Sequence, residues 1–121
     1  MKVIICTAFA LLLHLFLGWE WTLLAGVLYG LMTQYNGWLW GGLSVAAGWG
    51  LLVLFNFVVA SAPVGEMTHV TGQILGNLPG ALVVVMTLLI GGLLGILGGL
   101  VGTQLAQLVP ALRLYKPQVV A

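Results

Sequence analysis

The sequence predicts an all-α fold: a polytopic integral membrane helical bundle of about four transmembrane helices plus a short amphipathic interfacial helix. Hydrophobic residues make up 62% of the 121 residues and charged residues only 4%, whereas ordinary soluble domains carry roughly 25% charged residues. So few charged side chains cannot cover a water-soluble surface. Because long apolar runs also alternate with short turn signals, we expect one transmembrane domain over 1–121 with the lipid bilayer as its main solvent.

Four apolar runs define the expected spans. The third (38–62) and the last (80–109) exceed the roughly 20 residues that cross a bilayer. The first two (3–18 and 20–35) are shorter, since a helix of about 15 residues covers only about 23 Å. Two interpretations stay open for the first two runs: two short spans that place flanking Trp and Tyr residues in the interface, which we favour, or a re-entrant hairpin.

The N-terminal segment has some features of a secretory signal peptide. A lysine at position 2 precedes the apolar run 3–17, as in the first two regions of such a signal. The small residues of a cleavage site are missing, because Gly18-Trp19-Glu20-Trp21 follows. We therefore expect an uncleaved first span.

The basic residues lie at the two ends of the chain. Lys2 precedes the first span, and Arg113 and Lys116 lie in the expected tail 110–121. Four spans bring both ends to one side, and basic residues favour the cytoplasmic side of a membrane. We expect a protein of the bacterial inner (plasma) membrane with both termini cytoplasmic and both glutamates in outer loops. The re-entrant alternative gives the same sidedness.

Tryptophan pairs flank the second run. The pattern Gly-Trp-x-Trp occurs at 18–21 and again at 37–40. One interpretation is a relic of an internal repeat. We favour an aromatic belt, because Trp concentrates at the headgroup level of both membrane interfaces.

Glycine is the strongest packing signal, with 18 residues. Many lie three, four or seven residues apart within an apolar run, which places them on shared helix faces. In lipid, small residues let helix backbones approach closely, and this packing replaces the hydrophobic drive. We predict glycine-zipper contacts within the chain, against a second copy or against a partner, through Gly26, Gly30, Gly41, Gly48, Gly91, Gly95, Gly99 and Gly102.

Two polar residues interrupt the early apolar runs, His14 in the first and Asn56 in the third. Polar groups inside a span are costly and often functional. The step Ala10-x-x-x-His14 resembles the pigment-binding helix of purple-bacterial antenna polypeptides, and this resemblance implies a tetrapyrrole ligated by the imidazole. It covers one step of one helix, and antenna polypeptides have a single span. We favour hydrogen bonds from both residues across the bundle, and we expect no cofactor.

The segment 64–78 is the most organised polar stretch. Read as a helix, it places Glu66, His69, Gln73 and Asn77 on one stripe, opposite an apolar side. This pattern is typical of a helix lying in the interface. Glu66-x-x-His69 also matches a ligand step of di-iron bundles, which need more carboxylates from separate helices than this chain holds. We favour the interpretation that these residues form a polar helix face exposed to water.

No catalytic constellation is present, so we expect no enzyme. The chain has two acidic residues, both Glu, and three basic residues, too few for acid–base chemistry or for binding nucleic acid. The carboxylate of small multidrug transporters is missing from the first run, as is the polar signature of fluoride channels. We expect a structural or accessory protein that packs through glycine faces in a homo-oligomer or a larger membrane complex. The alternative is an oligomeric channel or transporter for a small solute, with His14, Asn56, Glu66 or His69 along its route.

Overall fold

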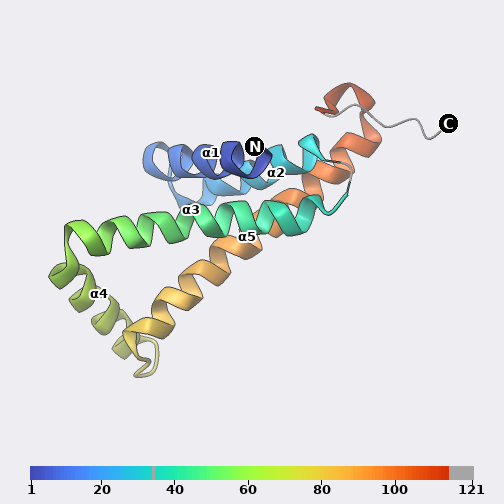
Figure 1. Cartoon of the computed structure of the whole chain (residues 1–121). Coiled ribbons are helices and arrows are strands. Elements are labelled where there is room, and N and C mark those ends of the chain that lie inside the picture. Colours follow the sequence, from blue (N-terminus) through green and yellow to red (C-terminus); the bar gives the residue numbers. More distant parts are fainter. Residues whose placement is uncertain (34, 115–121) are drawn as a thin grey trace.

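The chain is mostly helical in the part that the computed structural model describes, residues 1–33 and 35–114. In Figure 1, α1, α2 and α3 lie together, α5 crosses them diagonally, and α4 joins the ends of α3 and α5 where these two diverge. Two short 3-10 helices, η1 and η2, complete the chain. The elements are α1 (Lys2–Phe16), η1 (Trp19–Thr22), α2 (Leu23–Met32), α3 (Gly37–Val59), α4 (Ser61–Ile74), α5 (Gly80–Leu108) and η2 (Pro110–Leu112).

Two of the described helices, α3 and α5, are long and apolar enough to cross a membrane. Their most apolar 18 residues have mean hydropathies of 1.9 and 2.5. α1 has 15 residues and α2 has 10, so neither meets the same length by itself. The chain between them leaves the helical conformation at Gly18, where φ is 111°. Length and composition thus support membrane association through two helices, and they do not establish the predicted four spans.

The corner between α3 and α4 lies at Ala60, two residues before the predicted end of the third run. We predicted that the third run extends to Ala62, but α3 ends at Val59 and Ala60 has φ −142° and ψ 55°. α4 begins at Ser61, which puts Pro63 in its first turn. The first backbone N–H groups of a helix have no intrahelical partner, so proline is tolerated there.

α4 ends earlier than the predicted segment 64–78. Its last residue is Ile74, and Gly76 and Asn77 both have positive φ, 103° and 65°. The N–H of Leu78 then donates to the Gly72 carbonyl at 2.8 Å, which closes the turn that leads into α5. Asn77 therefore lies outside the helix and does not continue the predicted polar stripe.

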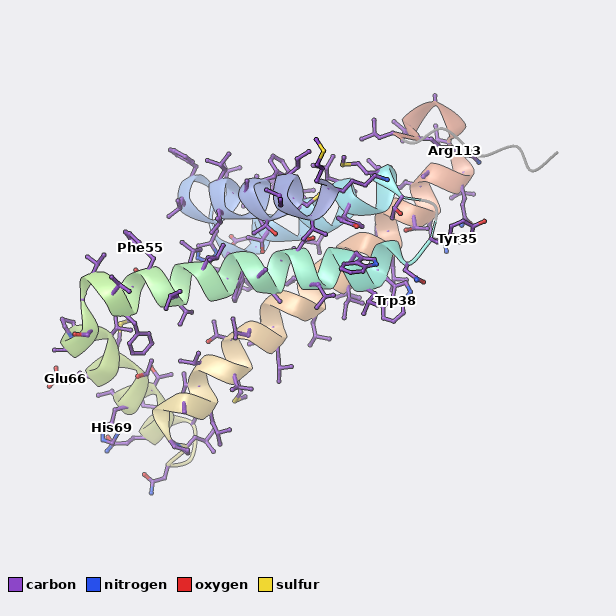
Figure 2. All side chains as sticks on the ribbon, in the orientation of Figure 1. Tyr35, Trp38, Phe55, Glu66, His69 and Arg113 are labelled. Carbon is purple, nitrogen blue, oxygen red and sulfur yellow. The ribbon has the colours of Figure 1, made fainter. Side chains whose placement is uncertain are left out.

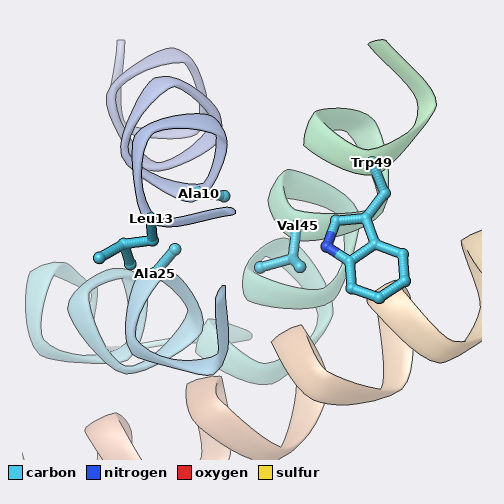
Figure 3. Packing of buried hydrophobic residues seen from close by; sticks show 5 residues of the cluster. All are labelled: Ala10, Leu13, Ala25, Val45 and Trp49. Carbon is cyan, nitrogen blue, oxygen red and sulfur yellow. The ribbon is translucent and has the colours of Figure 1, made fainter. Parts of the chain in front are cut away.

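Small side chains form the core where α1, α2 and α3 meet. Figure 3 shows Ala10 and Leu13 of α1, Ala25 of α2, and Val45 and Trp49 of α3 packed together. Three of these five are no larger than valine, so the helix axes come close. Trp49 is the one large side chain in the group and fills the space toward α5.

Both ends of the described chain lie at the same end of the bundle. The Lys2 side chain donates to the carbonyl of Met32, at the end of α2. The N–H of Leu114 donates to the carbonyl of Leu31 at 3.0 Å. Arg113 also lies here, whereas α4 lies at the opposite end of the molecule (Figure 2).

Candidate functional site

α5 packs against α3 through one glycine face. A Cβ atom built on Gly95 would lie 2.5 Å from the Gly41 carbonyl oxygen, and one on Gly99 would lie 2.5 Å from the Gly37 carbonyl oxygen. Real Cβ atoms essentially never come within 3.0 Å of such atoms. The two helix backbones are therefore in direct contact at these positions.

α5 packs against α2 through a second face. A Cβ on Gly26 would lie 2.5 Å from the Gly95 carbonyl oxygen. A Cβ on Gly98 would overlap the Leu23 carbonyl, and one on Gly102 would overlap the Val27 carbonyl. We call these contacts the glycine seam, formed by Gly26, Gly30, Gly37 and Gly41 on α2 and α3 and by Gly95, Gly98, Gly99 and Gly102 on α5.

The remaining two glycines of the predicted set have other neighbours. Gly48 lies beside α1, where its Cβ would be 3.4 Å from the Cβ of Ala10. A Cβ on Gly91 would lie 2.8 Å from Cδ2 of Trp49, so the indole ring rests on this glycine. A Cβ on Gly48 would make ordinary van der Waals contact with α1, whereas the missing side chain of Gly91 makes room for Trp49.

His14 and Asn56 line one groove between α1 and α3. The groove has a volume of 710 Å³ and its other lining residues are apolar. His14 comes from the last turn of α1, and Asn56 from the last turn of α3. We call this the α1–α3 groove, lined by Leu11, His14, Leu15, Leu51, Leu52, Leu54, Phe55, Asn56 and Val58.

A second, more polar space of 350 Å³ adjoins this groove and reaches α5. It shares His14, Leu52 and Asn56 with the groove. We call it the Trp49 pocket, lined by His14, Trp19, Trp49, Leu52, Val53, Asn56 and Thr87. Polar side chains from α1, α3 and α5 thus converge on one space.

Two nitrogen atoms at this pocket are buried without a hydrogen bond to any described residue. They are Nδ1 of His14 and Nε1 of Trp49. The two rings meet edge to face, with centroids 5.3 Å apart and planes at 80°. A buried polar group without a partner costs about 1–3 kcal/mol, and such groups often mark a functional site. The hydroxyl of Thr87, by contrast, donates to the Val83 carbonyl at 2.9 Å.

Glu66 and His69 lie on α4, away from this pocket. Both side chains are exposed, and Figure 2 shows them on the outer side of α4. Nε2 of His69 lies 3.1 Å from Nε2 of Gln73, one turn later. The described residues contain no group of three or more His, Cys, Asp or Glu side chains placed to hold a metal ion. The four candidate polar residues thus divide into a pair at the groove and a pair on the exposed face of α4.

Trp49 and Thr87 belong to the site but were not singled out as candidates from the sequence. The sequence does hold one signal for Trp49. The other four tryptophans flank the apolar runs and are exposed, whereas Trp49 lies mid-helix and is 8% exposed. An indole at such a position needs a hydrogen-bond acceptor, and this need can be inferred from the sequence alone. Nothing in the sequence distinguishes Thr87 from other helix threonines.

Comparison of the chain with protein-family models, with curated proteins and with solved structures found no match.

Proposed function

We propose that this protein is a small integral membrane protein with a structural or accessory role, held together by a glycine zipper. The glycine seam carries the proposal. Backbones of α2, α3 and α5 touch along it, and close packing of this kind stabilises helices in lipid. No solute can pass between helices that leave no room for a methyl group. The tightly packed helices α2, α3 and α5 therefore suit a structural role better than a transport route.

The outer surface supports the same proposal. Only 11% of the most apolar 18 residues of α5, and 28% of those of α3, are buried inside the chain. The exposed remainder is rich in Leu, Val, Ile and Phe, so lipid or another membrane protein must cover it. An accessory subunit of a larger membrane complex, or a homo-oligomer, provides such a cover.

The proposed topology has four spans in a bacterial plasma membrane, with both termini in the cytoplasm. In support, Lys2 and Arg113 lie at one end of the bundle, with the residues that close α2. Glu66 lies at the other end, on α4. The basic residues at one end match the excess of Lys and Arg in cytoplasmic loops. In this topology α1 and α2 are short spans, and α4 lies in the outer interface.

Purification at native expression level tests the accessory role. The full chain, tagged and extracted in a mild detergent, is expected to co-purify in fixed stoichiometry with a larger membrane assembly, or to form a homo-oligomer well above its 12.8 kDa. Light scattering measures the protein mass, and mass spectrometry identifies partners. A strictly monomeric particle in every mild detergent contradicts the proposal.

A channel or transporter for a small solute is the second candidate, and one observation favours it. His14 and Asn56 line the same groove, as residues along a solute route would. Because the glycine seam fills the contact of α2, α3 and α5, such a route would run between subunits. Measuring solute flux into proteoliposomes tests this second function. His14→Ala or Asn56→Ala is expected to reduce the flux while the protein stays folded, and an unchanged flux contradicts a transport role.

A further inference from the structure

We propose that the Trp49 pocket binds the head group of a neutral amphipathic lipid that carries hydrogen-bond-accepting carbonyls, such as a prenylated quinone, whose tail occupies the α1–α3 groove. This inference goes beyond a structural role. It requires that the chain lies in a membrane, and it does not depend on which partner covers the bundle.

Trp49 supplies the reason for an acceptor. Its side chain is 8% exposed, and its Nε1–H is buried without a partner in the described residues. The indole group is a donor only, so an occupant must offer an acceptor. Because the ring rests on Gly91, with its Cδ2 only 2.8 Å from a Cβ built there, the donor is held in place before any ligand arrives. Such preorganisation favours binding.

His14 and Asn56 supply the second polar contact. Nδ1 of His14 is also buried without a partner, and in one tautomer it is a donor. The amide of Asn56 lines both spaces and can donate or accept. Side chains from α1 and from α3 that carry these donors thus line one pocket, a composition that suits a head group with two carbonyl oxygens.

Charge selects a neutral head group. Of the described residues that line the two spaces, none is Asp, Glu, Lys or Arg. A phosphate buried there would lack a countercharge, which is costly. A quinone ring has no charge, and its flat faces can pack against Trp19, Trp49 and the His14 ring, since aromatic pairs gain from such contacts.

The adjoining groove suits an apolar tail. Seven of its nine lining residues are Leu, Phe or Val. Leu15, Leu54 and Phe55 are exposed on the outside of α1 and α3, so a lipid can enter sideways from the bilayer. The two volumes, 710 Å³ and 350 Å³, lie within the range of about 300–1,000 Å³ that ligand pockets occupy. The two spaces share His14, Leu52 and Asn56, so a head group in the Trp49 pocket and a tail in the α1–α3 groove can belong to one lipid.

Titration of the purified full chain with decylubiquinone tests the proposal. In dodecyl maltoside, calorimetry is expected to detect saturable binding of one quinone per chain, with tail-matched decane giving no saturation. Trp49→Phe keeps an aromatic ring but removes the donor, and we expect binding to weaken by about five- to tenfold, the loss of one hydrogen bond. Trp40→Phe is the matched control, because Trp40 is exposed and lies outside both spaces, and its binding is expected to stay unchanged.

A second variant keeps the proposal testable if Trp49→Phe does not fold. Asn56 is exposed, so Asn56→Leu is expected to fold, which circular dichroism and gel filtration check, and to weaken binding by a similar factor. Absence of saturable quinone binding overturns the proposal, as does equal binding by wild type and both pocket variants. Tighter, pocket-dependent binding of lyso-phosphatidylglycerol overturns it too, since that lipid has an anionic head. None of these outcomes alters the co-purification result, so the accessory role is judged separately.

Discussion

Gly95 of α5 lies against Gly41 of α3 so closely that a Cβ on Gly95 would be 2.5 Å from the Gly41 carbonyl oxygen. The same glycine faces Gly26 of α2, whose Cβ would lie 2.5 Å from the Gly95 carbonyl oxygen. The missing side chain of Gly95 lets α5 approach α3, and the missing side chain of Gly26 lets α2 approach α5. Because the atoms nearest to a Cβ on Gly95 are backbone atoms and the Cβ of Val45, no rotamer change can make room for an added methyl group.

Gly95→Ala is expected to lower the free energy of unfolding by about 1–3 kcal/mol, the usual cost of overpacking. Gly92→Ala is the control on the same helix, because its Cβ would meet nothing closer than the Cβ of Ala46 at 3.8 Å. We expect that variant to be at least as stable as wild type, by up to about 1 kcal/mol, because alanine favours the helix over glycine. Thermal unfolding in detergent, followed by circular dichroism, measures both. Equal stability of the two variants would mean that the seam is not closely packed.

Gly65 and Gly76 are both in open space, but we expect opposite results from their alanine variants. Nothing lies within 4 Å of a Cβ at either position. Gly65 is inside α4, so alanine should stabilise the protein by about 0.5–1 kcal/mol through helix propensity. Gly76 has φ 103°, and alanine there should cost about 1–2 kcal/mol of left-handed strain. Differential scanning calorimetry compares them, and effects of the same sign contradict the expectation.

Thr7→Val is expected to destabilise the contact of α1 with α3. The Thr7 hydroxyl donates to the Ser44 carbonyl across the two helices at 3.1 Å, and such bonds contribute about 0.6 kcal/mol on average. Thr71→Val is the control, since that hydroxyl donates to Met67 of its own helix. Reversible unfolding in mixed micelles gives both values. A loss in the control as large as in Thr7→Val would assign the effect to the exchange of a hydroxyl for a methyl group in general, and not to the hydrogen bond between the two helices.

Single cysteines test the proposed sidedness. The native Cys6 is buried, so it is expected to stay unlabelled by a membrane-impermeant maleimide. Glu66→Cys should react in intact cells, and Arg113→Cys only in inverted membrane vesicles. Both sites lie outside the two long helices. Arg113→Cys also removes the hydrogen bond from Nε to the Ala106 carbonyl of α5, so gel filtration checks that this variant folds. Reaction of both cysteines from the same side would exclude the four-span topology.

The sequence predicted helices well where a single local property determines their position. The apolar runs gave α3 and α5, because length and hydropathy are local properties. The third run ends at Val59, before its predicted end at Ala62. Pro63 follows that predicted end, but the first turn of a helix accepts proline, so α4 already begins at Ser61. Asn77 was placed on the stripe of Glu66 and His69, but the positive φ values of Gly76 and Asn77 end α4 first.

Only part of the candidate site could be predicted from the sequence. His14 and Asn56 were identified because polar residues in apolar runs are rare, and the groove that joins them depends on how α1 packs against α3. That packing joins residues far apart in the chain, such as Thr7, whose hydroxyl donates to the Ser44 carbonyl at 3.1 Å. Trp49 was overlooked because an indole in an apolar run looks like ordinary packing until its N–H is found without a partner.

The glycine seam also determines how a relative of this chain would be recognised. Its contacts consist of backbone atoms, so evolution has no side chain to vary there and little freedom to add one. The lipid-facing leucines and valines, in contrast, can interchange with little effect. We expect distant relatives to share the order and spacing of seam glycines on α2, α3 and α5 while differing at most other positions. Spacing, and not residue identity along the rest of the chain, is the signature to search for.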